Sequence, residues 1–166
     1  MIAAFLFAFS LFKEISMLLD KIRRFFFSPV LKILSISKLP EYKTSGSACF
    51  DLSITRGRAL QPNELHNFST GFKMEIPKGW CLLIFARSSL GQKKCIIPNS
   101  VGVIDSDYRG EVMIPLLNLS TETVLFEDDQ RIAQGLLVRA DQCSVVRAFS
   151  LSPSLRGEGG FGSTGI

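Results

Sequence analysis

The chain has 166 residues, enough for one domain with a sizeable core plus an appendage. Its net charge of +4 is confined to residues 1–40, which carry six Lys and Arg residues against two acidic ones, whereas residues 41–166 carry thirteen of each sign. A neutral main domain has no excess positive charge to hold a polyanion, which argues against nucleic-acid polymers as its partner.

The four cysteines, at positions 49, 81, 95 and 143, are widely spaced and form no C-x-x-C pair. The only histidine, His66, has no neighbour typical of a metal site, so no zinc centre is expected. We expect buried free thiols in a reducing compartment. A cytoplasmic location follows, with nuclear, organellar and viral-host settings left open.

Residues 1–30 form a hydrophobic and basic extension. Residues 1–12 are apolar, but they are fewer than the roughly 20 needed to span a bilayer, and no basic residues precede them as in a signal peptide. Apolar side chains then recur at helical spacing, at Phe12, Ile15, Leu19, Ile22 and Phe26. This spacing predicts an amphipathic helix ending near Ser28-Pro29. Three interpretations stay open: a membrane-surface or targeting helix, a helix that docks on a partner, or residues upstream of a true start at Met17.

The helical period disappears from Leu31 onward, and short strand-like segments follow. They cover residues 31–36, 111–117, 123–126, 132–138 and 145–149. Residues 71–76 alternate apolar and polar side chains, and Pro77-Lys78-Gly79 leads into residues 80–86, which predicts a hairpin. Many short strands with almost no helix between them predict an all-β barrel or sandwich over residues 31–150.

Arg87-Ser88-Ser89-Leu90-Gly91 directly follows a predicted strand. One interpretation is an ordinary solvated turn. The other is a phosphate-binding segment, because a guanidinium, hydroxyls and turn amides stand together at a rigid strand end. A serine-hydrolase nucleophile is not indicated, since G-x-S-x-G is absent.

The segment from Asn99 to Glu111 is the richest in polar groups. Asp105 stands between an apolar stretch and a polar turn, where a partly buried carboxylate can orient water as a general base; it can equally cap a turn. Asn99 offers both a donor and an acceptor to a base edge, and Tyr108 can pack against a sugar.

Two further sites are less distinctive. Asp51 ends a turn of small residues and reads most simply as a turn residue. Arg131 and Gln134 are three residues apart on a predicted strand. They should face opposite sides unless the backbone bends there.

The glycine-rich tail, residues 151–166, cannot pack a core and loses much backbone entropy when it is ordered. Arg156 suits phosphate oxygens, Phe161 offers a face for base stacking, and Ser163 and Thr164 add hydroxyls. The tail is therefore either a disordered end or a flexible lid over a nucleotide.

Taken in order, five segments resemble the conserved motifs of the trimeric dUTPases. They are Ser47 to Leu52, Ala86 to Gly91, Gly102 to Glu111, Arg131 to Gln134, and Arg156 to Gly165. The resemblance covers about Leu31 to Ile166, and its third and fifth motifs are long enough to be specific.

The resemblance implies a jelly-roll-like β-barrel and a homotrimer with three active sites at subunit interfaces. It implies hydrolysis of dUTP to dUMP and pyrophosphate with Mg2+. This reaction limits uracil incorporation into DNA and supplies dUMP for dTMP synthesis.

The resemblance also implies roles for single residues. Asp105 would deprotonate the attacking water. Asp51 would order the Mg2+ shell through water. The phosphates would be held by Arg87, Ser88, Ser89 and Gln134. Uracil would be read by Asn99 and by the hairpin backbone of Gly102, Val103 and Ile104, and Tyr108 would pack on the deoxyribose and exclude a 2′-hydroxyl. Met113 would be a further substrate contact, and the lid would contain Arg156, Phe161, Ser163 and Thr164.

The chain departs from the family pattern at Gln130, where an acidic residue is usual, and at Gly135, where a large apolar residue is usual. These departures concern local strand geometry rather than the catalytic groups. Two rival functions remain: a dCTP deaminase-like enzyme, which shares an Arg-Ser-Ser-Leu motif, and a non-catalytic homologue acting as a regulatory binding module.

Overall fold

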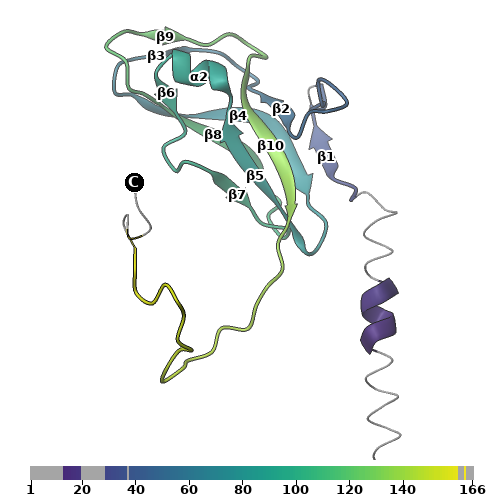
Figure 1. The fold of residues 1–166 in the computed structure, drawn as a ribbon. Coiled ribbons are helices and arrows are strands. Elements are labelled where there is room, and N and C mark those ends of the chain that lie inside the picture. The colour runs from purple at the N-terminus through teal and green to yellow at the C-terminus, as the bar shows by residue number, and fades with distance from the viewer. Residues whose placement is uncertain (1–12, 20–28, 37, 161–162, 164–166) are drawn as a thin grey trace, which may run out of the picture.

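The computed structural model describes residues 13–19, 29–36, 38–160 and 163 (Figure 1). Ten strands and a short helix follow one another along the main domain. They are β1 (Lys32–Ser35), β2 (Phe50–Ser53), β3 (Ala59–Leu60), β4 (Leu65–Glu75), β5 (Trp80–Ala86), α2 (Ser88–Gln92), β6 (Cys95–Ile96), β7 (Gly102–Ile104), β8 (Glu111–Asn118), β9 (Val124–Leu125) and β10 (Arg131–Arg139). The predicted all-β class is confirmed.

The strands form two four-stranded antiparallel sheets and one small pair. One sheet has the order β1-β4-β8-β6 and the other the order β2-β10-β5-β7, while β3 pairs with β9. Within the described part of the chain the sheets do not close into a continuous barrel. Each large sheet therefore keeps two edges, formed by β1 and β6 in the first and by β2 and β7 in the second.

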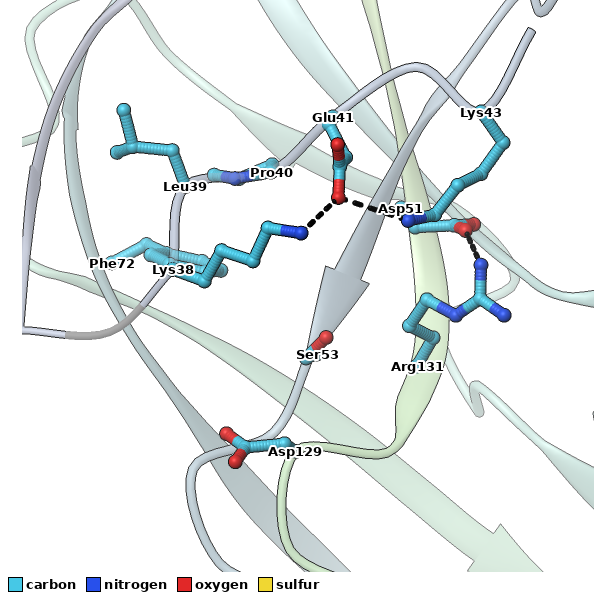
Figure 2. Close-up of a pocket in the computed structure, with 10 residues that line it drawn as sticks. All are labelled: Lys38, Leu39, Pro40, Glu41, Lys43, Asp51, Ser53, Phe72, Asp129 and Arg131. Carbon is cyan, nitrogen blue, oxygen red and sulfur yellow. Dashed lines mark hydrogen bonds and ion pairs between the residues drawn. The ribbon is translucent and has the colours of Figure 1, made fainter.

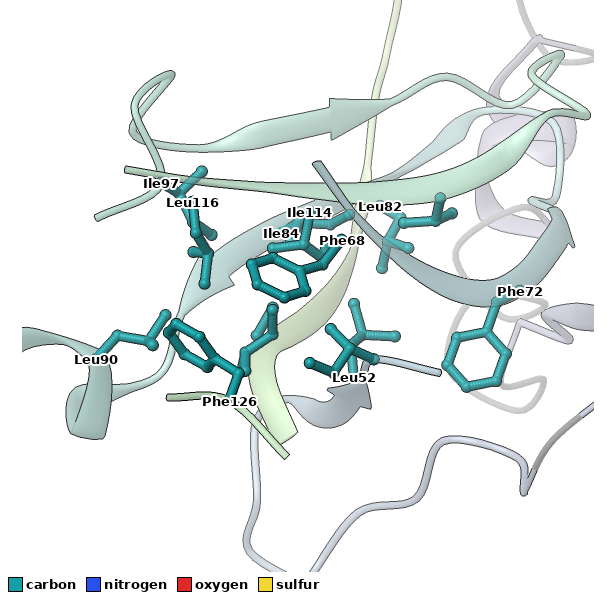
Figure 3. Close-up of a cluster of buried hydrophobic side chains, with 14 of the residues drawn as sticks. Leu52, Phe68, Phe72, Leu82, Ile84, Leu90, Ile97, Ile114, Leu116 and Phe126 are labelled. Carbon is teal, nitrogen blue, oxygen red and sulfur yellow. The ribbon is translucent and has the colours of Figure 1, made fainter. Parts of the chain in front are cut away.

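The core lies between the two large sheets, and alternation along the strands creates it (Figure 3). In β4 the inward positions are Phe68, Thr70, Phe72 and Met74, and the residues between them are partly or fully exposed. This period of two gives each strand one face for the core and one for solvent. The largest fully buried side chains are Phe68, Phe72, Phe126, Leu52, Ile54, Leu60, Leu82, Leu90, Ile114, Leu116, Ile132 and Val112.

The strands predicted near residues 31–36, 80–86, 111–117, 123–126 and 132–138 are confirmed. The predicted hairpin is wrong, because β4 pairs with β1 and β8, whereas β5 pairs with β10 and β7. The turn before Trp80, with Gly79 at φ 81°, instead carries the chain from one sheet to the other.

The strand predicted at residues 145–149 does not form. The segment is extended coil and exposed throughout, with Val145 at 92% and Phe149 at 103% relative exposure. Its β-branched and aromatic residues favour a strand only where a neighbouring strand can pair with them, and none of the described strands pairs with this segment.

The two departures near β10 are accommodated locally. At Gly135 a Cβ atom would stand 2.7 Å from Phe50 Cε2, so the Phe50 ring fills the space that a larger side chain would take. Gln130 Oε1 accepts a hydrogen bond from Glu127 N–H at 2.8 Å and closes the turn before β10. β10 begins directly after Gln130 and continues through Gly135.

Residues 13–19 are helical and exposed, which agrees with part of the predicted amphipathic helix. The rest of that helix lies outside the described residues. None of the helices described is long and apolar enough to cross a membrane.

Candidate active site

Asp51, Arg87 and Arg131 form a closed polar cluster at one end of the β2-β10-β5-β7 sheet. Asp51 Oδ1 lies 3.0 Å from Arg87 Nε, and its Oδ2 accepts a hydrogen bond from Arg131 Nη1 at 2.7 Å. Arg87 Nη1 in turn donates to the Arg131 carbonyl at 3.1 Å. The Asp51 side chain is only 13% exposed, so a largely buried carboxylate holds both guanidinium groups in place. We call this cluster the arginine seat.

A bulge in β10 brings Arg131 and Gln134 to the same region. The register with β2 shifts between Arg131 and Ala133, and two successive residues, Ile132 and Ala133, are both fully buried. The backbone bends between the two residues, which is the case in which Arg131 and Gln134 were not expected to face opposite sides. Gln134 is the register partner of Asp51, and its Nε2 donates to the Ala86 carbonyl at 3.1 Å, beside Arg87.

The segment after Arg87 forms α2 rather than a plain turn. Arg87 is its N-cap residue, and Ser88 and Ser89 are exposed in its first turn beside the arginine seat. Buried Leu90 anchors the helix to the core. The predicted phosphate-binding groups Arg87, Ser88, Ser89 and Gln134 are thus grouped within one chain.

A hollow of about 410 Å³ opens beside the arginine seat (Figure 2). Asp51, Ser53 and Arg131 line it from the sheet, and the loop of residues 38–43 lines it from the other side. Lys38 and then Lys43 bond to Glu41 at 2.6 and 3.0 Å and lower the pKa of Glu41 to about 2. Of the three acidic residues that line the hollow, Glu41 and Asp51 are thus paired with cations.

Asp105 lies in a tight turn directly after β7. Its carbonyl accepts a hydrogen bond from Tyr108 N–H at 3.2 Å, and Arg109 Nη1 donates to the carbonyls of Ser106 and Tyr108 at 2.8 and 2.9 Å. The Asp105 side chain is exposed in the single chain, so the expectation that it is partly buried is wrong for one chain alone. It lines a second hollow, of about 1000 Å³, between this turn and the end of β10.

The predicted base-reading residues lie along the same edge. Gly102, Val103 and Ile104 form β7, whose other edge has no partner in the described sheet. Val103 is 58% exposed, Asn99 is exposed in the loop before β7, and Ser100 has φ 61°. This segment is not a hairpin, since β7 pairs with β5 while β6 and β8 belong to the other sheet.

Tyr108 stands on the same turn as Asp105. Its hydroxyl donates to the Glu111 carbonyl at 2.9 Å, and its side chain crosses Gly110, where a Cβ would lie 2.3 Å from the phenolic oxygen. Tyr108 is 43% exposed, so a ring surface remains for a ligand. Met113 is 40% exposed on the outer face of β8, apart from the groups of the arginine seat.

The arginine seat and the Asp105 turn are far apart within one chain. Asp51 is in register with Gln134 and Phe85, whereas Asp105 follows Ile104, the partner of Leu82. The offset is about four residues along the strands, at about 3.3 Å each, and three strand spacings of about 4.8 Å across the sheet. These steps place the backbone positions of Asp51 and Asp105 roughly 20 Å apart.

The tail lies apart from both groups. After β10 the chain runs away from the sheets, and residues 141–158 are exposed throughout (Figure 1). Arg156 Nε donates to the Gly159 carbonyl at 2.7 Å, which is a bond within the tail itself. Ser163 is exposed, and Phe161 and Thr164 lie outside the described residues.

The described residues contain no group of three or more His, Cys, Asp or Glu side chains suited to a metal ion. All four cysteines are free, but only Cys95 is buried, so the expectation of four buried thiols is wrong. Burial raises the pKa values of the Cys49 and Cys95 thiols.

Arg131 is the functional residue that sequence reasoning missed. The sequence places Arg131 three residues before Gln134 in the fourth segment. On a straight strand, however, the two side chains would point to opposite faces of the sheet. Only the bulge shows that Arg131 completes the arginine seat.

Comparison with known proteins gives one consistent family. The family model described as dUTPase matches residues 36–165. The deoxyuridine 5′-triphosphate nucleotidohydrolase of Hydrogenobaculum sp. is 42% identical over 139 residues, covering 82% of this chain and 96% of that protein.

Two solved structures share the fold. The dUTPase of Staphylococcus bacteriophage 80alpha, solved as a mutant with dUpNHpp, has a TM-score of 0.75 at 24% identity and covers 84% of this chain and 100% of its own. A mutant dUTPase of phage phi11 of S. aureus, which coordinates a structural Mg(II) ion, has a TM-score of 0.67 at 20% identity and covers 73% of this chain and 97% of its own.

Proposed function

Because this chain belongs to the dUTPase family and hydrolyses dUTP, we propose that its active site is shared between copies of the chain. The roughly 20 Å between Asp51 and Asp105 carries this proposal. A general base must lie within about 3 Å of the water that it activates, and that water must lie beside the phosphate under attack. One chain cannot hold the triphosphate on the arginine seat and present Asp105 to it.

The assembly that we propose is a homotrimer with one site at each interface. Such a ring brings the arginine seat of one copy beside the Asp105 turn of the next. The exposed segment between residues 141 and 155 supports an assembly, since Val145, Val146, Phe149, Leu151 and Leu155 are each at least 79% exposed. Apolar side chains gathered on one extended segment are typical of a surface that another chain covers.

In the shared site Asp105 acts as the general base. It takes a proton from water as the water oxygen forms a bond to the α-phosphorus, and the bond from that phosphorus to the bridging oxygen breaks. Pyrophosphate leaves with the electron pair, and dUMP remains. The exposed position of Asp105 in one chain leaves its carboxylate free to face a substrate held by a neighbour.

The arginine seat holds the phosphates. Arg87 is oriented by Asp51, so its guanidinium is positioned before the substrate arrives, and Ser88 and Ser89 add hydroxyl donors at the same place. Gln134 lies against the same strand end.

The donors present fit a Mg2+ ion that arrives with the triphosphate. Asp51 is a single carboxylate whose two oxygens each accept one cationic partner, and each retains capacity for a water. Mg2+ characteristically keeps several waters and binds through one or two carboxylates plus substrate phosphates. When bound, it would neutralise phosphate charge; Asp51 would hold it through water.

Selection of the nucleotide belongs to the Asp105 side of the site. The free edge of β7 presents backbone donors and acceptors at Gly102, Val103 and Ile104, and Asn99 adds an amide. Uracil and cytosine exchange donor and acceptor at adjacent ring positions, so this edge leaves groups unpaired with cytosine. Tyr108 packs on the deoxyribose and leaves no room for a 2′-hydroxyl.

The tail completes the site as a lid. Arg156 and Ser163 are exposed and reach no other part of their own chain by the bonds described, which suits a role on a neighbouring copy. With Phe161 and Thr164 they close over a bound triphosphate and exclude water. The free thiols fit a cytoplasmic setting, which fractionation of the native cell would test.

A pyrophosphate-release assay with dUTP, dCTP, dTTP and UTP tests this function. We expect rapid release from dUTP and little from the others. Ammonia from dCTP without pyrophosphate from dUTP would instead identify a deaminase, and no turnover of dUTP with Mg2+ would identify a binding module.

A further inference from the structure

The carboxylate of Glu111 is bound to an irregular part of β4. Ser69 Oγ and Gly71 N–H both donate hydrogen bonds to Glu111 Oε1, the second at 2.9 Å. Gly71 has φ 69°, and the register between β4 and β8 shifts between Ser69 and Lys73. This bulge frees the Gly71 N–H from the regular strand pairing and turns it to a side chain of β8.

The donors around Glu111 keep it ionised. Ser69 first, then the Gly71 N–H, and further Lys73, lower the pKa of Glu111 from its ordinary value. Thr55 Oγ1 donates to Ser69 Oγ at 3.2 Å, so the Ser69 proton is directed to the carboxylate. Charge-assisted bonds of this kind are stronger than neutral ones, and they tie Glu111, at the start of β8, to the irregular part of β4.

The main chain of Glu111 meets the Asp105 turn. Its carbonyl accepts the Tyr108 hydroxyl at 2.9 Å, and Gly110 leaves the space that the Tyr108 ring occupies. Tyr108 N–H closes the turn on the Asp105 carbonyl at 3.2 Å. The turn is therefore anchored at its start by the β7 pairing and at its end by Glu111.

We propose that Glu111 is a positioning residue for the loop of residues 105–110. It holds the Tyr108 ring and the Asp105 carboxylate in one arrangement without touching the substrate. The inference rests on the roles proposed above for Asp105 and Tyr108. Its consequence is that discrimination between deoxyribose and ribose depends on a side chain that faces β4.

The test measures kcat/KM for dUTP and for UTP on the same preparation of Glu111→Ala, because the folded fraction cancels in their ratio. A shift of a reacting group by about 1 Å costs about 100-fold in rate, and we expect the dUTP-to-UTP ratio to fall about tenfold. Glu111→Gln should restore most of the ratio, since its amide oxygen accepts both bonds. If Glu111→Ala does not fold, Ser69→Ala removes one of the two bonds and should lower the ratio by about threefold.

Glu64→Ala is the matched control. Glu64 also accepts a backbone N–H, from Gln61 at 2.7 Å, and a side-chain donor, from Arg58 at 2.6 Å, but it lies just before β4. We expect this control to leave the ratio unchanged. An unchanged ratio in Glu111→Ala, with a lowered ratio in Tyr108→Ala, would overturn the proposal.

Amide hydrogen exchange over residues 105–110 separates this proposal from the role of Tyr108. If Tyr108→Ala keeps the wild-type ratio, the sugar contact in the proposed function is wrong. The positioning role then stands if Glu111→Ala speeds exchange in this loop and Glu64→Ala does not. It fails if Glu111→Ala leaves that exchange unchanged or if both variants speed it equally.

Discussion

Replacing Arg131 with alanine separates the contribution of the arginine seat to activity from its contribution to stability. Arg131 donates to Asp51 Oδ2 at 2.7 Å, but its side chain is 42% exposed. Screening at that exposure limits the ion pair to about 1 kcal/mol of folding free energy. The melting temperature should fall by only about 2–4 °C.

Activity should fall much further in the same variant. Without Arg131, Asp51 keeps only Arg87 as a partner, and the carboxylate that orients the Arg87 guanidinium is free to rotate. A misplaced phosphate contact costs about 10- to 100-fold in kcat/KM for dUTP. Pyrophosphate release gives this rate, and thermal unfolding monitored by fluorescence gives the stability.

Arg139→Ala is the matched control. Arg139 ends the same strand, is 35% exposed, and pairs with Asp141 at 2.8 Å far from the arginine seat. Its loss should change kcat/KM by less than about twofold, as expected for an exposed pair. The reasoning fails if Arg131→Ala keeps the wild-type rate, or if both variants lose activity equally.

Three more outcomes follow from the site. Asp105→Asn should abolish turnover, because it removes the base, and should leave binding of a non-hydrolysable dUTP analogue largely intact, because the side chain keeps its shape. Pyrophosphate release measures the turnover and calorimetry measures the binding. Retained activity would exclude Asp105 as the base. Truncation before Arg156 should leave a folded assembly with little activity, and a truncated protein with most of its rate would refute the lid. The lowered pKa of Glu111 gives stability that is present above its ordinary value of 4.5 and is lost as pH falls through the folded-state pKa. Chemical unfolding at several pH values should therefore show a steeper loss below about pH 4.5 in the wild type than in Glu111→Gln, and equal slopes would contradict this.

The strands were predictable because their cause is local. Alternation along β4 follows from burial of one strand face, and residues 71–76 display that period directly in the sequence. Asp105 and Tyr108 were identifiable for a similar reason, since both stand on a short turn whose residues are consecutive.

The pairing of the strands and the exposed coil at residues 145–149 were not predictable in this way. β4 and β5 are separated by a turn that looks like a hairpin turn, but the core between the sheets determines which strands meet. Residues 145–149 carry strand-forming side chains, but no strand in the described part of the chain pairs with them. Arg131 was missed because a bulge, which depends on packing of Ile132 and Ala133, sets the direction of its side chain.

The shared active site is tested most directly by mixing two inactive variants. Asp105→Asn keeps an intact arginine seat, and Arg87→Ala keeps an intact Asp105 turn. If each site joins the seat of one copy to the turn of the next, random mixing in a trimer gives about a quarter of the sites both intact parts. Doubly tagged, co-expressed trimers all contain both variants, and each then has one complete site in three. They should therefore recover about a third of the wild-type dUTP turnover. Mixed trimers no more active than either variant alone would show that each chain carries its own complete site.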